Sequence, residues 1–130
     1  CCNVVCGPGG TAHGILIRAG EILDGVAAAQ ARRPGVREAQ LARGPGNLTR
    51  ALGLSRADDG APLLAGGRIQ LLPGTVPAQV VAGPRVNVPR AHDRPWRFSD
   101  PTSAAVSAFS WHPAARGRQP GAGWQRPQGR

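Results

Sequence analysis

The sequence has no lysine, no tyrosine and no methionine among its 130 residues. All 16 basic residues are therefore arginine, and with 7 acidic residues they give a formal net charge of +9. A chain of this length corresponds to one ordinary domain. Because it opens at Cys1 and contains no methionine, we expect it to be a fragment of a longer protein.

Long apolar runs are also missing. No stretch approaches the roughly 18 apolar residues that a membrane-spanning helix needs. The chain does not open with the charged and then apolar segments of a signal peptide. We therefore expect a soluble, cytoplasmic protein with no membrane partner.

Cysteine is scarce and confined to one end of the chain. The three cysteines are Cys1, Cys2 and Cys6. They lie too close together to close a disulfide framework around the chain, which fits a reducing compartment. A metal site would need a second pair of ligands at suitable spacing, but the histidines are scattered, at His13, His92 and His112. We expect neither a metal nor a cofactor.

The excess of arginine favours a polyanionic partner, because clustered arginines neutralise phosphates and release counterions. The exclusive use of arginine, with 19 glycines and 13 prolines, also fits a coding sequence of high GC content. Part of the charge would then follow from genome composition. Nucleic acid binding and a merely basic, solvated surface are the two interpretations of the charge.

Strand and turn signals alternate at the start of the chain. Residues 2–6 form a short extended run, Gly7 to Gly10 a turn, and residues 12–19 a second strand, which predicts a β-hairpin. Asp24 can cap a helix over residues 26–31. We expect Pro34-Gly35 to end this helix just after two arginines, whose charges suit a helix C-terminus.

Two further helices are predicted in the middle of the chain. A short one covers about Glu38 to Arg43. The next follows the turn Gly44-Pro45-Gly46, with Asn47 as its N-cap and Gly53 as its C-terminal cap. Leucine and alanine repeat at helical spacing between these two caps.

The second half of the sequence has weaker patterns. Short apolar segments separated by proline and glycine are candidate strands, at residues 69–72, 80–81, 85–88 and 96–98. From about Trp111 the chain consists of Pro, Gly, Gln and Arg without periodicity, a composition that cannot offset the entropy lost on ordering. We predict one domain over residues 1–109 and a basic, disordered tail over 110–130.

Arg18 ends an apolar strand, so we expect its guanidinium at the edge of the core, where an unpaired charge would be costly. It needs a partner. A structural ion pair with Glu21 or Asp24 is one interpretation. The other is a charge that anchors a carboxylate or a water molecule in a pocket.

The segment from Arg43 to Arg50 is the most specific local signal. A glycine turn that leads into a capped helix points free backbone N–H groups and the positive end of the helix dipole outward. With Arg43 and Arg50 on either side, this arrangement suits a DNA phosphate. An ordinary helix-initiating turn fits the same residues equally well.

Asn3 stands in an extended apolar run, where its amide must be hydrogen-bonded if it is buried. A structural role and a binding role both remain open for it. Asp58-Asp59, within Ala-Asp-Asp-Gly, is typical of a surface turn rather than of an acid–base pair. No serine or cysteine stands in a recognisable nucleophile elbow.

Several segments match one known family in order and at similar spacing. They are Asn3-Val4-Val5, Gly14-Ile15-Leu16-Ile17-Arg18-Ala19, Leu41-Ala42-Arg43-Gly44-Pro45-Gly46-Asn47-Leu48, Ala51-Leu52-Gly53, Gly83-Pro84-Arg85-Val86 and Arg94-Pro95-Trp96-Arg97-Phe98. Over about residues 1–107 the chain resembles the C-terminal portion of the alkyladenine (3-methyladenine) DNA glycosylase family. The tail from about Ser110 lies outside the resemblance.

The resemblance implies base excision repair by hydrolysis of the N-glycosidic bond of an alkylated or deaminated purine, such as 3-methyladenine or hypoxanthine, flipped out of duplex DNA. It implies that Arg18 and the backbone carbonyl of Val86 help to hold the attacking water. Asn3 and Leu16 would line the base pocket, where Asn3 rejects the exocyclic amine of guanine. The turn from Gly44 to Leu48 would contact a backbone phosphate. Together with the flanking arginines, the expected DNA-binding residues are Arg43, Gly44, Pro45, Gly46, Asn47 and Arg50.

The chain also departs from the family pattern. The family's catalytic glutamate, its pocket histidine and the tyrosines that stack on the flipped base and wedge into the gap would all precede Cys1. We therefore expect the isolated chain to be inactive. Asn87 stands where the family usually has glycine, and its side chain could crowd the backbone near the pocket.

The resemblance implies an α+β fold, in which a curved, mostly antiparallel sheet carries peripheral helices. We expect a monomer that acts on duplex DNA containing a damaged purine. The alternative is a non-catalytic, basic nucleic-acid-binding protein or a degraded copy of a glycosylase. A basic structural or ribosome-associated domain is a third interpretation.

Overall fold

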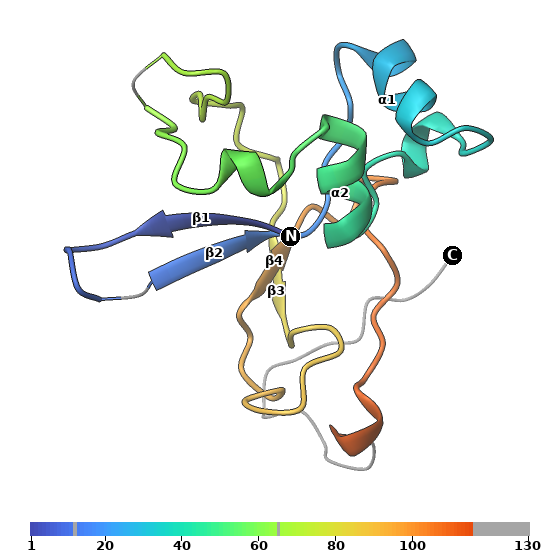
Figure 1. Cartoon of the computed structure of the whole chain (residues 1–130). Coiled ribbons are helices and arrows are strands. Elements are labelled where there is room, and N and C mark those ends of the chain that lie inside the picture. Colours follow the sequence, from blue (N-terminus) through green and yellow to red (C-terminus); the bar gives the residue numbers. More distant parts are fainter. Residues whose placement is uncertain (12, 65, 116–130) are drawn as a thin grey trace. The chain divides into compact units, whose positions relative to one another are not determined.

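The computed structural model describes residues 1–11, 13–64 and 66–115, and the chain forms two compact units, Cys1–Val76 (unit 1) and Pro77–Arg130 (unit 2) (Figure 1). Unit 1 contains β1 (Cys2–Cys6), β2 (His13–Ile17), α1 (Val26–Arg32), α2 (Pro45–Leu52) and the 3₁₀ turns η1 (Glu38–Gln40) and η2 (Arg56–Asp58). Unit 2 contains β3 (Val81–Gly83), β4 (Arg97–Ser99) and the 3₁₀ turn η3 (Pro113–Ala115). Each unit holds one antiparallel strand pair, which confirms the predicted α+β class.

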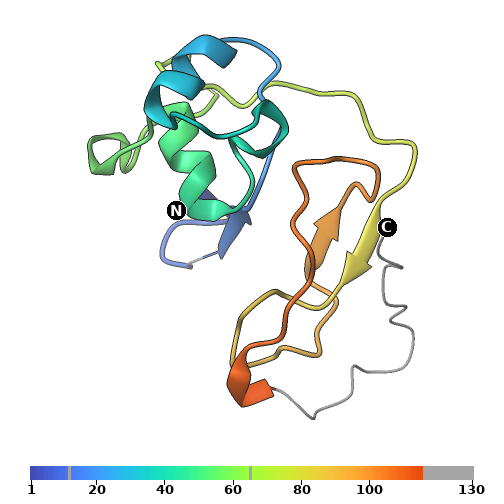
Figure 2. The same cartoon turned by 90° about the vertical axis from the view of Figure 1, so that its right-hand side faces the viewer.

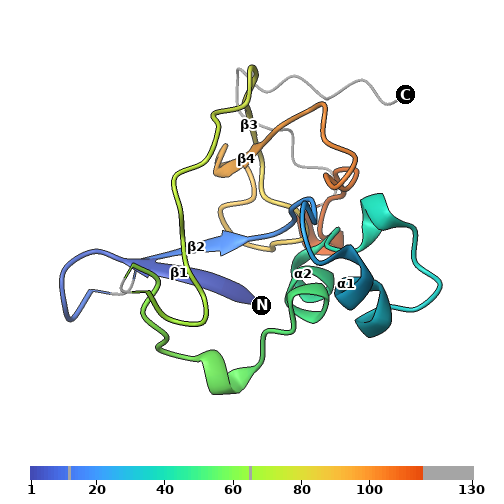
Figure 3. The same ribbon diagram turned by 90° about the horizontal axis from the view of Figure 1, so that it is seen from above.

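The predicted hairpin is confirmed in unit 1. β1 pairs with β2 in a register that sets Cys2 opposite Ile17 and Asn3 opposite Leu16. Residues directly opposite each other lie on the same face of a sheet, and alternate residues lie on opposite faces. Cys2 and Ile17 pack against the helical core, and the hairpin extends away from α1 and α2 toward its turn (Figure 3). The other face therefore points away from that core.

The first helix begins at Val26, but its N-cap is Gly25 and not the predicted Asp24. Gly25, in a left-handed conformation with φ 69°, is the N-cap of α1, and no side chain caps the helix. The Asp24 carboxylate accepts a hydrogen bond at 2.7 Å from the N–H of Gly25. The prediction of Asp24 as the cap was wrong, because its carboxylate bonds the adjacent N–H rather than one in the first turn. The helix ends at Arg32, before Pro34-Gly35, as predicted.

α2 begins earlier than predicted. Gly44 is its N-cap and Pro45 its first residue. Proline favours this position because a backbone N–H there would have no acceptor within the helix, so its absence costs nothing. Asn47 is not the cap: its side-chain amide donates to the Arg43 carbonyl at 2.8 Å. Gly53 ends the helix with φ 67°, which confirms it as the C-terminal cap.

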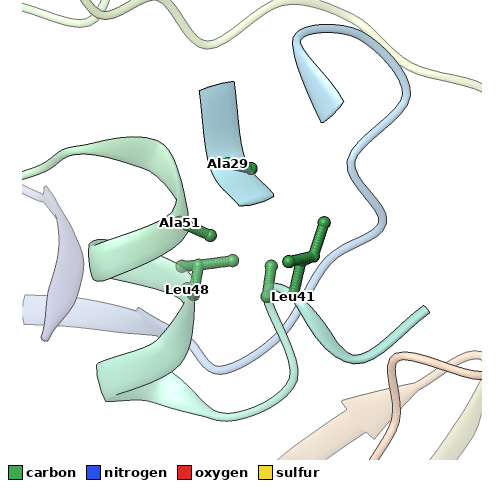
Figure 4. Packing of buried hydrophobic residues seen from close by; sticks show 5 residues of the cluster. Ala29, Leu41, Leu48 and Ala51 are labelled. Carbon is green, nitrogen blue, oxygen red and sulfur yellow. The ribbon is translucent and has the colours of Figure 1, made fainter. Parts of the chain in front are cut away.

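The segment before α2 is helical only over η1, Glu38–Gln40, and is shorter than the predicted helix. Leu41 and Ala42 then turn inward and are fully buried. They form the core of unit 1 together with three residues of the helices, Ala29, Leu48 and Ala51 (Figure 4). Burial of this apolar surface is what holds α1 and α2 side by side.

Arginine side chains tie the helices together. Arg32 donates from Nη1 to the Ala51 carbonyl at 2.8 Å. A Cβ on Gly53 would lie 3.0 Å from Arg32 Nε, so glycine fits here for its space as well as for its left-handed backbone. An isolated β-bridge joins Ala19 to Arg43 and connects the exit of the hairpin to the residues before α2.

The predicted strand over residues 69–72 was wrong. These residues form no strand, and Leu71 donates one backbone hydrogen bond, to Leu63, at 2.9 Å. Leu71 and Leu72 are exposed. A β-branched or leucine-rich run forms a strand only where a partner strand and a packing surface exist, and this segment has neither among the described residues.

Unit 2 is built around the pair β3 and β4, with Val81 opposite Ser99 and Gly83 opposite Arg97 (Figure 2). Each strand begins one residue later than predicted. The predicted strand over residues 85–88 was wrong, because Asn87 adopts a left-handed backbone with φ 55° and the chain turns there. A strand cannot continue through such a residue.

The predicted tail begins at residue 110, and residues 110–115 are among those described. The carbonyl of Ser110 accepts a hydrogen bond from the N–H of Asn87 at 3.3 Å. The Trp111 ring meets Phe109 edge to face at a centroid distance of 4.7 Å and His92 at 5.9 Å. Residues 116–130 lie outside the described residues. The boundary near residue 109 and the disorder of the tail stay predictions.

Replacing Leu41 by alanine should remove the centre of the core of unit 1. Leu41 is 0% exposed, so the substitution leaves a cavity, and we expect the free energy of unfolding to fall by about 3 kcal/mol. Urea unfolding of the 130-residue chain, followed by circular dichroism, measures the change. Leu64→Ala is the control, because Leu64 is 87% exposed. Equal unfolding midpoints for the two variants would contradict this core.

Candidate nucleic-acid interface

The first turn of α2 has the geometry of an anion-binding turn. Gly44 adopts φ 102° and ψ 151°, a region that essentially only glycine enters. No side chain caps the helix. The N–H groups of Gly46 and Asn47 have no acceptor within the helix, because they precede its first intrahelical bond, from Leu48 to Gly44 at 2.8 Å. Two backbone donors and the positive end of the helix dipole thus remain available to an anion.

The two arginines that were expected to flank this turn lie on either side of it along the chain. Arg43 directly precedes the turn and is half-buried. Arg50 is exposed and lies in the last turn of α2, where its charge favours the helix C-terminus instead. Arg50 follows Asn47 by three residues and Gly46 by four, so it lies about 5–6 Å along the helix axis from the free N–H groups, or roughly one turn. Both arginines therefore remain candidates for a phosphate at this turn.

The expected base-pocket residues lie together on the hairpin. Asn3 and Leu16 are directly opposite each other in the register of β1 and β2. Arg18 follows Leu16 by two residues, so strand alternation continues the same face to Arg18. Asn3 is exposed, and Leu16 and Arg18 are half-buried. One face of the hairpin, turned away from the core, thus carries all three residues.

Arg18 does not form the ion pair considered from the sequence. One salt bridge joins two described residues, Arg68 and Asp58, and none joins Arg18 to Glu21 or to Asp24. The next residue, Ala19, pairs with Arg43 in the isolated bridge. The structure thereby brings the hairpin face close in space to the turn at the start of α2.

Val86 belongs to unit 2, whereas the other expected site residues belong to unit 1. It is 8% exposed and belongs to the turn that Asn87 forms. Arg85 holds this loop closed, because its Nη2 donates to the carbonyl of Arg90 at 2.9 Å. Asn87 takes the left-handed conformation that glycine would take, and asparagine tolerates this conformation better than most residues. Its side chain does not prevent the turn from forming.

The acidic pair of the sequence is a surface turn, as predicted. Asp58 ends η2, and its carboxylate accepts hydrogen bonds from the N–H of Ser55 at 2.8 Å and from Arg68. The hydrogen bond from Arg68, followed by that from the Ser55 backbone, lowers the pKa of Asp58. A carboxylate with a lowered pKa is a weaker general base, so these contacts favour a structural role.

Sequence reasoning missed a hollow formed by the segment that connects α1 to α2 and by the first turn of α2. It has a volume of about 350 Å³ and is lined by three arginines, Arg33, Arg37 and Arg43, together with residues that include Gln40 and Asn47. These residues are spread over fifteen positions of the chain, from 33 to 47. The doublet Arg32-Arg33 was interpreted only as a helix end. The folded loop between the helices is what assembles the hollow.

Two negative findings apply to the described part of the chain. Residues 1–11, 13–64 and 66–115 contain no group of three or more His, Cys, Asp or Glu side chains placed to hold a metal ion. In the same ranges, no helix has both the length and the apolar character needed to cross a membrane.

Comparison with known proteins identifies a family. The family model of methylpurine-DNA glycosylase (MPG) matches residues 1–104. A protein of Rhodococcus jostii (strain RHA1) with the name "Putative 3-methyladenine DNA glycosylase" is 52% identical over 116 residues, which cover 88% of this chain and 52% of that protein. A protein of the same name from Nocardia farcinica (strain IFM 10152) is 47% identical over 121 residues, which cover 90% of this chain and 57% of that protein. The chain spans about half the length of these curated relatives.

Replacing Gly44 by alanine tests whether the turn depends on its backbone conformation. At φ 102° a Cβ is strained, and we expect a loss of about 1–3 kcal/mol in the free energy of unfolding. Gly46→Ala is the matched control: its Cβ would meet open space within the helix, and alanine should stabilise α2 by up to about 1 kcal/mol. Urea unfolding of both variants decides. A shift in the same direction for both would show that the turn is not held in this conformation.

Proposed function

The chain belongs to the methylpurine-DNA glycosylase family, and we propose on this premise that it is part of a base excision repair enzyme. The proposed reaction is hydrolysis of the N-glycosidic bond of an alkylated or deaminated purine, such as 3-methyladenine or hypoxanthine, flipped out of duplex DNA. The proposed enzyme acts as a monomer on a DNA duplex that contains the damaged purine. The family match over residues 1–104 is the observation that carries the proposal.

The hairpin face supports a role in base recognition. Asn3 and Leu16 lie side by side across the two strands, one polar and one apolar, which suits a purine that presents both a π-face and a polar edge. In the proposed enzyme the amide of Asn3 meets the edge of the flipped base. Hypoxanthine is accepted there and the exocyclic amine of guanine is excluded.

The same face supports a role in orienting water. Arg18 is half-buried on this face and forms no salt bridge among the described residues, so its guanidinium is free to bind a water molecule or a carboxylate. We assign the second water contact to the backbone carbonyl of Val86. These two groups orient the water but cannot deprotonate it, since neither is a base at neutral pH.

The general base is proposed to lie outside these 130 residues. No carboxylate shares the hairpin face with Asn3, Leu16 and Arg18. Asp58 is bound by Arg68, and hydrogen bonds from the Thr102 side chain and backbone lower the pKa of Asp100. We propose that the glutamate lies in the part of the relatives' length that this chain does not cover.

A second candidate function is nucleic-acid binding without catalysis. It is favoured by the anion-binding turn of α2, which is complete within unit 1, and by the lack of a carboxylate on the hairpin face. A degraded copy of a glycosylase would have the same properties. Base release by a completed protein discriminates between this function and the enzyme.

A chimera tests the enzymatic proposal. The 130-residue chain replaces the segment of the Rhodococcus jostii relative that it matches, and release of hypoxanthine from duplex DNA is followed by cleavage at the abasic site. We expect release by the chimera and none by the isolated chain, because the chain alone lacks the base. The unmodified relative is the positive control.

An inactive chimera that still folds would favour non-catalytic binding. Release by the isolated chain would contradict the placement of the general base outside it.

Two substitutions in the active chimera test the roles on the hairpin face. Asn3→Ser should raise release of undamaged guanine relative to hypoxanthine by about tenfold, because it removes the group that excludes the exocyclic amine. Arg18→Ala should lower release of every substrate by roughly 100-fold, because a misplaced water costs about that much. Initial rates on matched duplexes measure both effects.

Val5→Ala is the control for the pocket assignment. Val5 is 76% exposed and lies on the same face of β1 as Asn3. An unchanged ratio of guanine to hypoxanthine release in Asn3→Ser would make Asn3 a structural residue and end the pocket assignment.

A further inference from the structure

The hollow lined by Arg33, Arg37 and Arg43 concentrates positive charge without a carboxylate to balance it. The salt bridge between described residues, Arg68 to Asp58, involves no residue that lines the hollow. Glu38 follows Arg37 directly in the sequence but does not line the hollow. Three like charges that share a space of about 350 Å³ repel one another unless an anion enters.

Arg33 is held in place before any ligand arrives. Its Nη1 donates to the carbonyl of Gln40 at 2.7 Å and also to the carbonyl of Leu41. These bonds use one nitrogen and leave the rest of the planar guanidinium for other acceptors. A donor that is already immobilised loses less entropy when it binds, which is the property of a prepared site.

The hollow borders the anion-binding turn of α2. Arg43 and Asn47 line it, and Asn47 also contributes one of the two free backbone N–H groups of the first helical turn. The side-chain amide of Asn47 bonds back to the Arg43 carbonyl at 2.8 Å, which fixes these two lining residues to each other. One wall of the hollow is therefore the edge of the turn itself.

We propose that this hollow binds a second phosphate of the DNA backbone, next to the phosphate at the first turn of α2, with Arg33 and Arg37 as its ligands. The inference rests on the proposed function in one respect, because that function makes DNA the partner. Arginine suits this ligand, since its planar fork donates two parallel hydrogen bonds to phosphate oxygens. Adjacent phosphates of one strand present the repeated charge that the two neighbouring sites require.

The salt dependence of DNA binding tests the hollow without any need for base release. The affinity of the 130-residue chain for an undamaged duplex is measured by fluorescence anisotropy between about 50 and 200 mM salt. Arg37→Gln should reduce the slope of log K against log salt by about 0.9, the value for one lost phosphate contact. Arg37 is the position of choice because it is exposed and its side chain has no hydrogen bond to a described residue.

Arg56→Gln is the matched control. It removes the same charge from an exposed position of unit 1 that does not line the hollow, so the slope should stay at the wild-type value. Arg37→Lys should keep the slope and lower the affinity several-fold, because the ammonium preserves the charge but not the fork. Circular dichroism of each variant verifies that it is folded.

The location is tested by nuclear magnetic resonance. Titration of the labelled chain with the duplex should shift the amide signals of Gly35 and Val36, which line the hollow, and leave that of Leu64 unchanged. Equal slopes for Arg37→Gln and Arg56→Gln, or unshifted signals of Gly35 and Val36, would overturn the proposal. If Arg43→Gln still lowers the slope in that case, the turn of α2 remains a DNA contact and only the hollow is lost.

A chain that shows no salt-dependent binding to the duplex would overturn the hollow and the turn together. The enzymatic proposal is decided separately, by base release from the chimera.

Discussion

The backbone bridge between Ala19 and Arg43 is the contact on which the arrangement of unit 1 depends. It is continued by a hydrogen bond from the N–H of Gly20 to the carbonyl of Ala42 at 3.4 Å. These contacts join the exit of the hairpin to the last residues before α2. The face with Arg18 and the turn with the free N–H groups are thereby held in one unit, although they lie far apart in the sequence. Ala42 is fully buried beside Leu41, so the residues next to the bridge belong to the core.

The shortage of acidic residues determines how the arginines are used. With 16 basic and 7 acidic residues, most guanidiniums have no carboxylate available, and several bond to backbone carbonyls instead. Those of the described residues are Arg32 on Ala51, Arg33 on Gln40 and Leu41, Arg85 on Arg90 and Ala91, and Arg97 on Ser107. Such bonds fix a side chain without neutralising it. Arg33 therefore gives both a structural tie and an unbalanced charge, which is why the hollow beside it attracts an anion.

The parts of the fold that glycine and proline delimit were predictable from the sequence. The hairpin and the C-terminal ends of α1 and α2 follow from turns in which these residues have a defined conformational role. The absence of strands at residues 69–72 and 85–88 was not predictable. A short apolar run becomes a strand only where a partner strand pairs with it, and the left-handed conformation of Asn87 depends on tertiary structure. The opposition of Asn3 and Leu16 follows from the hairpin register. The hollow does not, since it depends on how the loop after α1 folds back.

Binding and chemistry are distributed differently over this chain. The groups that fit phosphate, from Arg33 to Asn47, lie within one unit and need no residue from elsewhere to form their geometry. The groups assigned to the water are split, because Arg18 belongs to unit 1 and Val86 to unit 2, and the base is proposed to lie outside the 130 residues. Duplex affinity in the isolated chain is therefore expected whether or not the complete protein is an enzyme, so affinity alone does not establish catalysis. Conversely, loss of base release after a change on the hairpin face concerns the chemistry only if duplex affinity is preserved, since different residues of unit 1 are proposed for binding and for chemistry.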